Sequence, residues 1–133
     1  MRRLGARLLT GALILTVPLV ASAALLHLKL SRSEPVANAR MAASPTQVKL
    51  WFTQRPELTV TSIKVKSGSG ITAVERALAP LARAEADGSP ITAPVGAALS
   101  VGHYEIVWRT MARDGHVLNG VIPFDVGGAA APR

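Results

Sequence analysis

Asp114 and His116, in the segment RDGHVLNG near the end of the chain, are the residues whose types and spacing best fit metal chemistry. On an extended strand, side chains two positions apart point to the same face, and Gly115 between them leaves room for a ligand. A carboxylate and an imidazole on one face can supply an oxygen and a nitrogen to a transition metal. Taken alone, Asp-x-His is more often part of a surface loop than a ligand pair, and with its turn-like Asn119-Gly120 the segment is also typical of a polar bend between two strands.

Further ligands would have to come from the other histidines, because two residues do not complete a metal site. The chain has three histidines and no cysteine, so the candidates are His27 and His103. His103 lies on the strand face opposite Tyr104 and is predicted to be a solvent-facing strand residue. No serine is singled out as a nucleophile, and no pair among the eight acidic residues is marked for glycosidase chemistry, so no enzymatic activity is predicted.

Alternation of apolar and polar residues predicts several short strands and therefore an all-β domain. The runs are 26–30, 46–52, 103–112 and 120–126. The residues that share one face are, strand by strand, Val48, Leu50 and Phe52; Tyr104, Ile106, Trp108 and Thr110; and Ile122, Phe124 and Val126. Tyr104 and Trp108 are predicted to be core residues. Pro123 predicts that the last strand lies at a sheet edge or has a local break. Short strands separated by turn signals favour a β-sandwich or a small barrel.

Two segments have less regular patterns. In residues 58–66, Val60 and Ile63 are both candidates for burial, and the slip in phase between them predicts a bulge or bend. Residues 72–87 are rich in Ala, Leu, Glu and Arg, which favours helix. Pro80 lies in the middle of that segment, so we expect a short or broken helix, or a loop.

The first residues of the chain have the three parts of a secretory signal peptide. Three arginines precede an apolar run of 13 residues, 8–20, and the small residues Ala21-Ser22-Ala23 follow it. A spanning helix needs roughly 20 apolar residues, so an uncleaved anchor is the less favoured alternative. The predicted organisation is a signal peptide at 1–23 (1–26 if cleavage directly precedes His27), one β domain at 24–126 and a disordered tail at 127–133.

Removing the predicted signal peptide lowers the positive charge. The whole chain has 15 Lys and Arg and 8 Asp and Glu, and the signal peptide holds three of the arginines and no acid, which leaves 12 basic and 8 acidic residues, a net charge of +4. The basic residues are scattered, so nucleic acid is not predicted as a partner. With no cysteine, the exported domain must be stabilised by packing and not by disulfides.

Two longer stretches resemble the CopC family of periplasmic copper-binding proteins. HLKLSRSEP, residues 27–35, resembles the start of the family's mature chain. VGHYEIVWRTMARDGHVLNGVIPFDV, residues 101–126, resembles its Gly-x-Tyr-x-Val-x-Trp-Arg strand, its Asp-Gly-His turn and its Phe-x-Val strand. The resemblance runs from His27 to Val126 and is weakest between Val60 and Thr92. It implies an immunoglobulin-like, Greek-key β-sandwich or barrel.

The resemblance also implies a function and a set of ligands. The family binds copper(II) through an N-terminal histidine and the Asp and His of the turn, which correspond here to His27, Asp114 and His116. Two imidazoles and a carboxylate suit a tetragonal copper(II) site. We therefore expect a monomeric periplasmic carrier or buffer of copper(II) in copper resistance or homeostasis, with an inner-membrane copper transporter of the CopD type as a partner.

The chain departs from the family pattern near both ends. A free amine on His27 requires cleavage directly before it, whereas the better cleavage site leaves Ala24-Leu25-Leu26 ahead of it. Ala112 replaces a serine that the family has before the turn. The alternative is a CopC-like domain that has lost tight copper binding and serves as an interaction module of a membrane copper-transport system. A copper oxygenase is disfavoured, because Asp114 would occupy a position that oxygen chemistry needs open.

Overall fold

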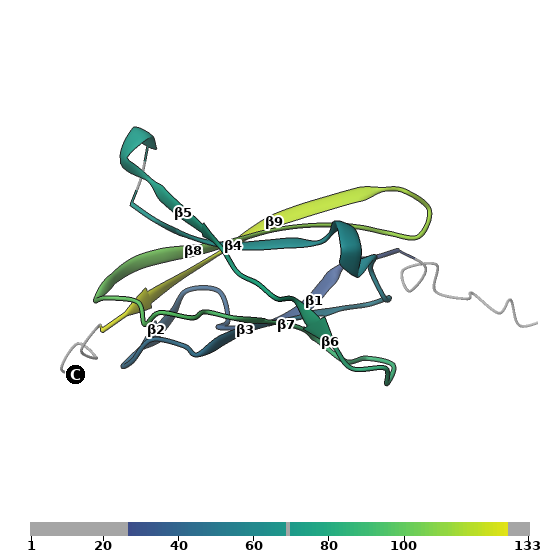
Figure 1. The fold of residues 1–133 in the computed structure, drawn as a ribbon, viewed down its shortest axis with the longest axis horizontal. Helices are drawn as coiled ribbons and strands as arrows, with labels where there is room; N and C mark the ends of the chain where they lie inside the picture. The colour runs from purple at the N-terminus through teal and green to yellow at the C-terminus, as the bar shows by residue number, and fades with distance from the viewer. Residues whose placement is uncertain (1–26, 69, 128–133) are drawn as a thin grey trace, which may run out of the picture.

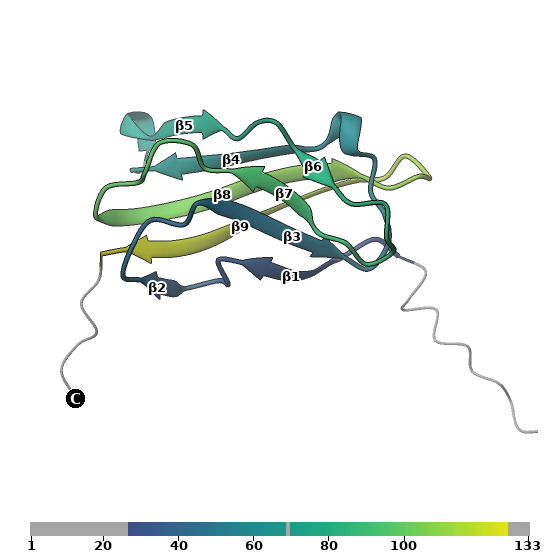
Figure 2. The same ribbon diagram turned by 60° about the horizontal axis from the view of Figure 1, so that its bottom comes forward.

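The computed structural model describes residues 27–68 and 70–127, which form two β-sheets packed face to face (Figure 1, Figure 2). One sheet has the order β1-β3-β7-β6, with β1 (Leu30–Glu34), β3 (Gln47–Phe52), β7 (Ile91–Pro94) and β6 (Ala82–Arg83). The other has the order β2-β9-β8-β4-β5, with β2 (Ala39–Met41), β9 (Val117–Val126), β8 (Gly102–Met111), β4 (Ser62–Ser67) and β5 (Val74–Ala77). The predicted all-β sandwich is confirmed.

The chain passes from one sheet to the other after β1, β2, β3, β5 and β7. Neighbouring strands are antiparallel except β2 and β9, which are parallel. These crossings interleave the two sheets in the manner expected of a Greek-key sandwich. As a result, the start of the described chain, the β6–β7 turn and the β8–β9 turn lie at the same end of the molecule (Figure 1, Figure 2).

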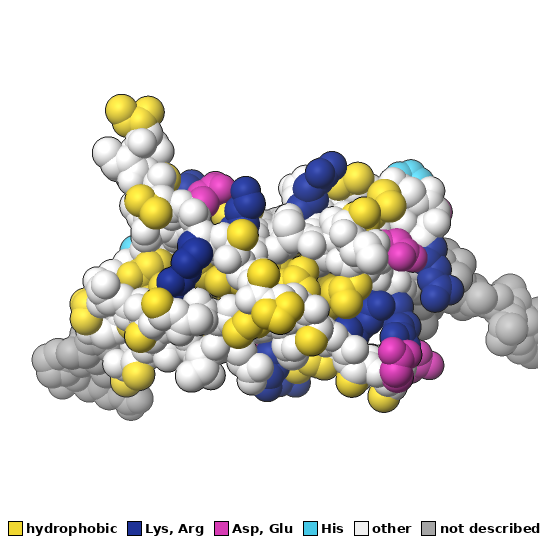
Figure 3. Space-filling model, in the orientation of Figure 1, with side chains coloured by type: hydrophobic (Ala, Val, Ile, Leu, Met, Phe, Trp, Pro, Cys, Tyr) yellow, Lys and Arg dark blue, Asp and Glu magenta, His cyan; other side chains and the backbone are white. Residues whose placement is uncertain are grey.

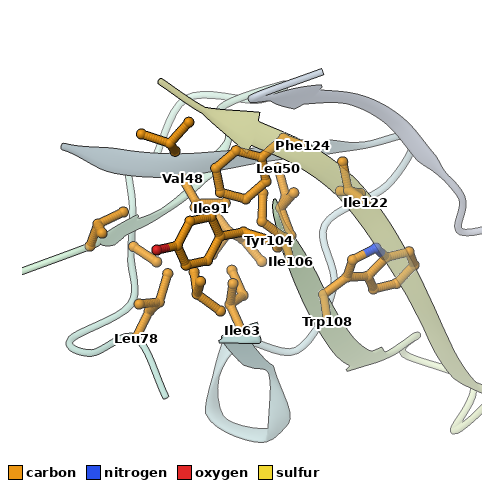
Figure 4. Close-up of a cluster of buried hydrophobic side chains, with 14 residues drawn as sticks. Val48, Leu50, Ile63, Leu78, Ile91, Tyr104, Ile106, Trp108, Ile122 and Phe124 are labelled. Carbon is orange, nitrogen blue, oxygen red and sulfur yellow. The ribbon is translucent and has the colours of Figure 1, made fainter. Parts of the chain in front are cut away.

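The core lies between the sheets and is built from the inward-facing residues of the long strands (Figure 4). Leu50 of β3 and Ile106 of β8 are fully buried, and Phe124 of β9 is 1% exposed. Tyr104 stacks on Phe124 with ring centroids 5.7 Å apart, and its hydroxyl donates to the Ser100 carbonyl at 2.9 Å. Burying apolar surface contributes about 25 cal/mol per Å² to the stability of the fold. The apolar residues that point inward from both sheets therefore hold the sheets together.

Trp108 and Gly120 are paired across the hairpin of β8 and β9. The indole of Trp108 is 6% exposed, and the ring of Phe52 meets it edge-on with centroids 5.4 Å apart. A Cβ at position 120 would lie 2.6 Å from Cζ2 of Trp108, so only glycine leaves room for the indole. The pair Asn119-Gly120 is therefore part of strand β9 and not a turn.

The segment before β4 is a helical turn instead of a strand with a bulge. Leu58–Val60 forms a 3-10 turn, η2, and the hydroxyl of Thr61 donates to the Glu57 carbonyl at 2.6 Å to close it. Val60 is 49% exposed, so its predicted burial is wrong. Ile63, in β4 beyond the turn, is 1% exposed, as predicted. The slip in phase thus marks the end of one element and the start of another.

Of the short or broken helix, or loop, predicted for residues 72–87, the helix is absent; two short strands, β5 (Val74–Ala77) and β6 (Ala82–Arg83), lie there with loops after each. A 3-10 turn, η3 (Gly70–Thr72), precedes β5. Pro80 lies in the loop between β5 and β6. β5 pairs with β4 from Lys64 opposite Ala77 to Ser67 opposite Val74. Helix propensities differ by less than about 1 kcal/mol per residue, so pairing with β4 outweighs the local preference for helix.

Pro123 lies in β9, which pairs along its whole length with β8 but only over its last three residues with β2. Those residues are Phe124–Val126, and just before them the Pro123 carbonyl accepts the N–H of Asn38 at 2.6 Å. The N–H and C=O of one strand residue point to the same side, so the N–H that proline lacks would face β2 and not β8. β9 lies between β8 and β2 and is therefore not the edge strand that was predicted, although the short β2 pairs with only its last three residues.

The predicted signal peptide lies outside the described residues, as do residues 128–133 of the predicted tail. Gly127, the first residue of that tail, donates its N–H to the Met41 carbonyl at 2.8 Å and so extends the pairing of β2 with β9. Within residues 27–68 and 70–127, no helix is long and apolar enough to cross a membrane.

Candidate metal centre

Asp114 and His116 lie in the turn between β8 and β9, beyond the ends of both strands. Two backbone hydrogen bonds of 2.9 Å close this turn, from the Gly115 N–H to the Ala112 carbonyl and from the Ala112 N–H to the His116 carbonyl. Gly115 has φ of 88°, in the left-handed region that glycine adopts at little cost. The turn, and not the alternation of a strand, therefore brings the two predicted ligands together.

The carboxylate of Asp114 bonds to both the backbone and the ring of His116. The N–H of His116 donates to Oδ1 at 3.1 Å, and its Nδ1 lies 3.0 Å from Oδ2. These hydrogen bonds, the backbone one first, hold the pKa of Asp114 below its usual value, because they favour the charged form. Both side chains are exposed, so an ionised carboxylate and an imidazole are open to solvent at neutral pH.

The spacing of these two side chains fits two neighbouring ligands of one metal ion. Bonds from a metal to imidazole nitrogen and carboxylate oxygen are about 2.0–2.2 Å, which places two ligands at a right angle about 2.8–3.1 Å apart. The separation between Nδ1 of His116 and Oδ2 of Asp114 is 3.0 Å. At this separation both atoms can bind one metal ion.

His27 is the first described residue, and its backbone is fastened to the end of β3. The hydroxyl of Thr53 donates to the His27 carbonyl at 2.7 Å and accepts the N–H of Lys29 at 2.9 Å. The N–H of Thr53 donates to the Lys29 carbonyl at 2.9 Å, and Leu28 is buried. The exposed imidazole of His27 has no hydrogen-bond or ion-pair partner among the described residues, so it is available as a ligand.

The structure brings together two of the three predicted ligands. Asp114 and His116 are in contact, whereas His27 lies outside their group: within the described residues no three His, Cys, Asp or Glu side chains are placed to hold one metal ion. A site with all three ligands requires the His27 ring and the turn to approach each other. Thr53, which positions His27, is the residue that the sequence patterns missed, because its role depends on the pairing of β1 with β3.

The remaining metal-binding side chains of the described chain lie elsewhere. His103 is exposed, as predicted, and its Nδ1 is 2.8 Å from Oδ1 of Asp125, the residue opposite it in β9. It is the second residue of β8, which ends at Met111, and eight steps of about 3.3 Å per residue place it about 26 Å from that end. His103 therefore stands far from the β8–β9 turn and does not supply the third ligand.

A family model described as the CopC domain matches residues 30–127. The chain belongs to the CopC family. The matched range includes Asp114 and His116 and begins after His27. This CopC-family chain is 30% identical over 119 residues to Copper resistance protein C of Xanthomonas campestris pv. juglandis, covering 88% of this chain and 93% of the relative. It is 31% identical over 113 residues to Protein YobA of Escherichia coli K12, covering 85% and 89%.

Solved structures of other family members have the same fold. CopC from Methylosinus trichosporium OB3b is 26% identical to this chain with a TM-score of 0.64, and the match covers 80% of this chain and 100% of that one. PcoC, a methionine-rich copper resistance protein from Escherichia coli, is 24% identical with a TM-score of 0.61, covering 75% and 98%. The second similarity shows the fold alone. The family membership and fold predicted from the sequence are confirmed.

Proposed function

We propose that this CopC-family protein binds copper(II) in the periplasm and acts as a carrier or buffer of the ion in copper resistance. The contact between Asp114 and His116, in the turn of a chain that belongs to this family, is the observation that carries the proposal. Imidazole and carboxylate ligands suit copper(II), which binds most tightly among the first-row divalent ions. The turn is exposed, so the ion can enter and leave without any opening of the core.

His27 is the third ligand in this proposal. Its ring is exposed and has no partner among the described residues, and the chain behind it is held by Thr53 and by the buried Leu28. Because the backbone that follows His27 is held in place, the His27 ring stays close to the end of the sandwich that carries the β8–β9 turn. If cleavage occurs directly before His27, its free amine adds a second nitrogen from the same residue.

The proposed role is binding and transfer, without catalysis. With Asp114 bound, one coordination position that oxygen chemistry requires is filled. A carrier must give up its ion, and an inner-membrane copper transporter of the CopD type is the proposed recipient, with the protein acting as a monomer. Periplasmic location rests on the signal peptide predicted for residues 1–23.

Copper(II) titration of the purified mature protein, followed by calorimetry and EPR, tests this function. His116→Ala and His27→Ala should each weaken copper binding at least about tenfold, which corresponds to about 1.4 kcal/mol. His103→Ala is the matched control, because His103 is an exposed histidine at the other end of the hairpin. Unchanged affinity in His116→Ala would remove the assignment.

The second candidate is a domain that keeps the fold but binds copper weakly and serves as an interaction module. The separation of His27 from the Asp114–His116 pair favours it. So do the three residues that the better signal-peptide cleavage site leaves ahead of His27. Mass spectrometry of the exported protein distinguishes the two: a chain that starts at His27 supports tight binding, and one that starts at Ala24 supports the weaker function.

A further inference from the structure

A cavity of about 190 Å³ opens at the end of the sandwich that carries His27 and the β8–β9 turn. Residues 53–56, which follow β3, form one wall, and Arg83 and residues 87–89 form another. A second hollow shares residues 54, 55 and 87 with the cavity and is completed by Arg113. In Figure 3, Lys and Arg side chains lie beside Asp and Glu side chains at the right-hand end of the molecule. Three arginines thus line two adjoining depressions.

Arg83, which lines this cavity, carries one hydrogen-bond donor that has no acceptor. Its Nη1 donates to the Pro56 carbonyl at 2.7 Å, which ties β6 to the segment after β3. Its Nε is buried and has no hydrogen-bond partner among the described residues. A buried donor without an acceptor destabilises a fold, and one on a guanidinium does so more strongly because it is charged. A shift of the Arg83 side chain that turned Nε toward an acceptor in the cavity would remove this cost.

The positive charge of Arg55 is paired only with two exposed carboxylates. Its Nη1 donates to the backbone carbonyl of Glu85 at 2.6 Å. The carboxylates of Glu85 and Asp87 lie 3.7 Å from its guanidinium, and their side chains are 100% and 99% exposed. Ion pairs as exposed as these contribute little and exchange readily with other anions. Arg113, also exposed, has no hydrogen bond or ion pair with another described residue.

We propose that this cavity binds a small carboxylate. A guanidinium presents a planar fork of N–H donors that matches the two oxygens of a carboxylate. Arg55 and Arg83 offer such donors from two walls of the cavity, and Arg113 stands at the rim of the adjoining hollow. The volume is close to that of an apolar cavity that holds benzene, about 150 Å³, so an anion the size of acetate or malonate fits.

The proposed anion site adjoins both halves of the candidate metal centre. Thr53, which lines the cavity, donates its hydroxyl to the His27 carbonyl. Arg113, which lines the adjoining hollow, directly precedes Asp114. Copper(II) that arrives as a carboxylate complex would therefore meet ligands for the ion and donors for its anion at one end of the molecule. The anion site goes beyond the proposed copper function and does not depend on it.

NMR titration of the metal-free mature protein with sodium malonate and with sodium acetate tests the proposal, with sodium chloride at equal ionic strength as the reference. Both carboxylates should shift the amide signals of residues 53–56 and 87–89 in a saturable way that chloride does not reproduce. Arg113→Gln, which removes a side chain with no described partner, should weaken malonate binding at least fivefold. Arg83→Gln should weaken it further, and Arg83→Lys should not restore it.

Two further variants should not weaken malonate binding: one should strengthen it and the other should leave it unchanged. Asp87→Asn removes a carboxylate that competes for Arg55, so malonate should bind at least twofold more tightly. Arg109→Gln, an exposed arginine on the outer face of β8, should leave binding unchanged. Shifts that chloride reproduces, or equal losses in the Arg109 and Arg113 variants, would overturn the proposal. Phosphate binding more tightly than malonate would overturn the assignment to carboxylates. Because copper is absent throughout, none of these results bears on the proposed copper function.

Discussion

Trp108 lies over Gly120, its partner across the β8–β9 hairpin, so closely that a methyl group on Gly120 would come within 2.6 Å of the indole. The same indole meets the edge of Phe52, the last residue of β3 in the opposite sheet. This packing joins the hairpin to the other sheet near the end where Thr53 holds His27 and the turn carries Asp114 and His116. Hairpin packing and the candidate ligands are therefore coupled through a few neighbouring residues.

Gly120→Ala should lower the free energy of unfolding by about 1–3 kcal/mol, the usual cost of overpacking a core. The added methyl group has to displace the indole of Trp108 or bend β9 away from it. Urea unfolding followed by Trp fluorescence measures the change. Asn119→Ala is the control, since Asn119 is exposed on the other face of the same strand. Equal stability of the Gly120 variant and the natural protein would show that the indole is not confined as described.

Thr53→Val should loosen the start of the described chain with little effect on the rest of the fold. The substitution keeps the shape of the side chain but removes the hydroxyl that bonds to the His27 carbonyl and the Lys29 N–H. Each such hydrogen bond contributes about 0.5–1.5 kcal/mol, so the Lys29 amide should exchange with solvent several-fold faster. Hydrogen exchange by NMR measures this, and Thr53→Ser should restore the slow rate. Unaltered exchange in Thr53→Val would contradict the anchoring role.

Asp114→Asn should weaken copper(II) binding by a similar factor at pH 5, 6 and 7. Hydrogen bonds from His116 lower the pKa of Asp114 in the folded protein. A lowered pKa means that the contribution of the ionised carboxylate is present above its unfolded value, near 3.9, and is lost only as the pH falls through the lower folded value. Asp114 thus remains charged throughout this range. Copper titrations of both proteins at the three pH values measure the factor, and a mutational effect that disappears at pH 5 would contradict the lowered pKa.

The strands that the sequence predicted well are those whose pattern reflects burial on one face. In β3 and β8 each inward residue alternates with an outward one, and Leu50 and Ile106 are fully buried. Residues 72–87 have the composition of a helix but pair with β4 and β7, because the neighbouring strands and Pro80 decide their conformation. Pro80 indicated from the sequence that a helix would be interrupted, but the pairing with β4 and β7 is not visible in any local pattern.

The candidate site shows the same division between local and long-range information. If the segment were a strand, Asp114 and His116 were predicted to face the same way, with a polar bend as the alternative; the structure has them in contact in a turn whose Gly115 has a positive φ. The position of His27 depends on Thr53, 26 residues away, and therefore on the register of β1 with β3. Short-range spacing predicted that the two side chains lie on the same side, whereas their contact in the turn and the anchoring of His27 required the tertiary structure.

Paramagnetic broadening of NMR signals by one equivalent of copper(II) tests most directly whether His27 and the turn share one ion. One equivalent should broaden the amide signals of residues 28–29 and of 112–117 together, because the ion lies between them. The signals around His103 and Asp125, about 26 Å away along the hairpin, should stay sharp. Broadening of the turn alone, with residues 28–29 unaffected until a second equivalent is added, would contradict a shared site.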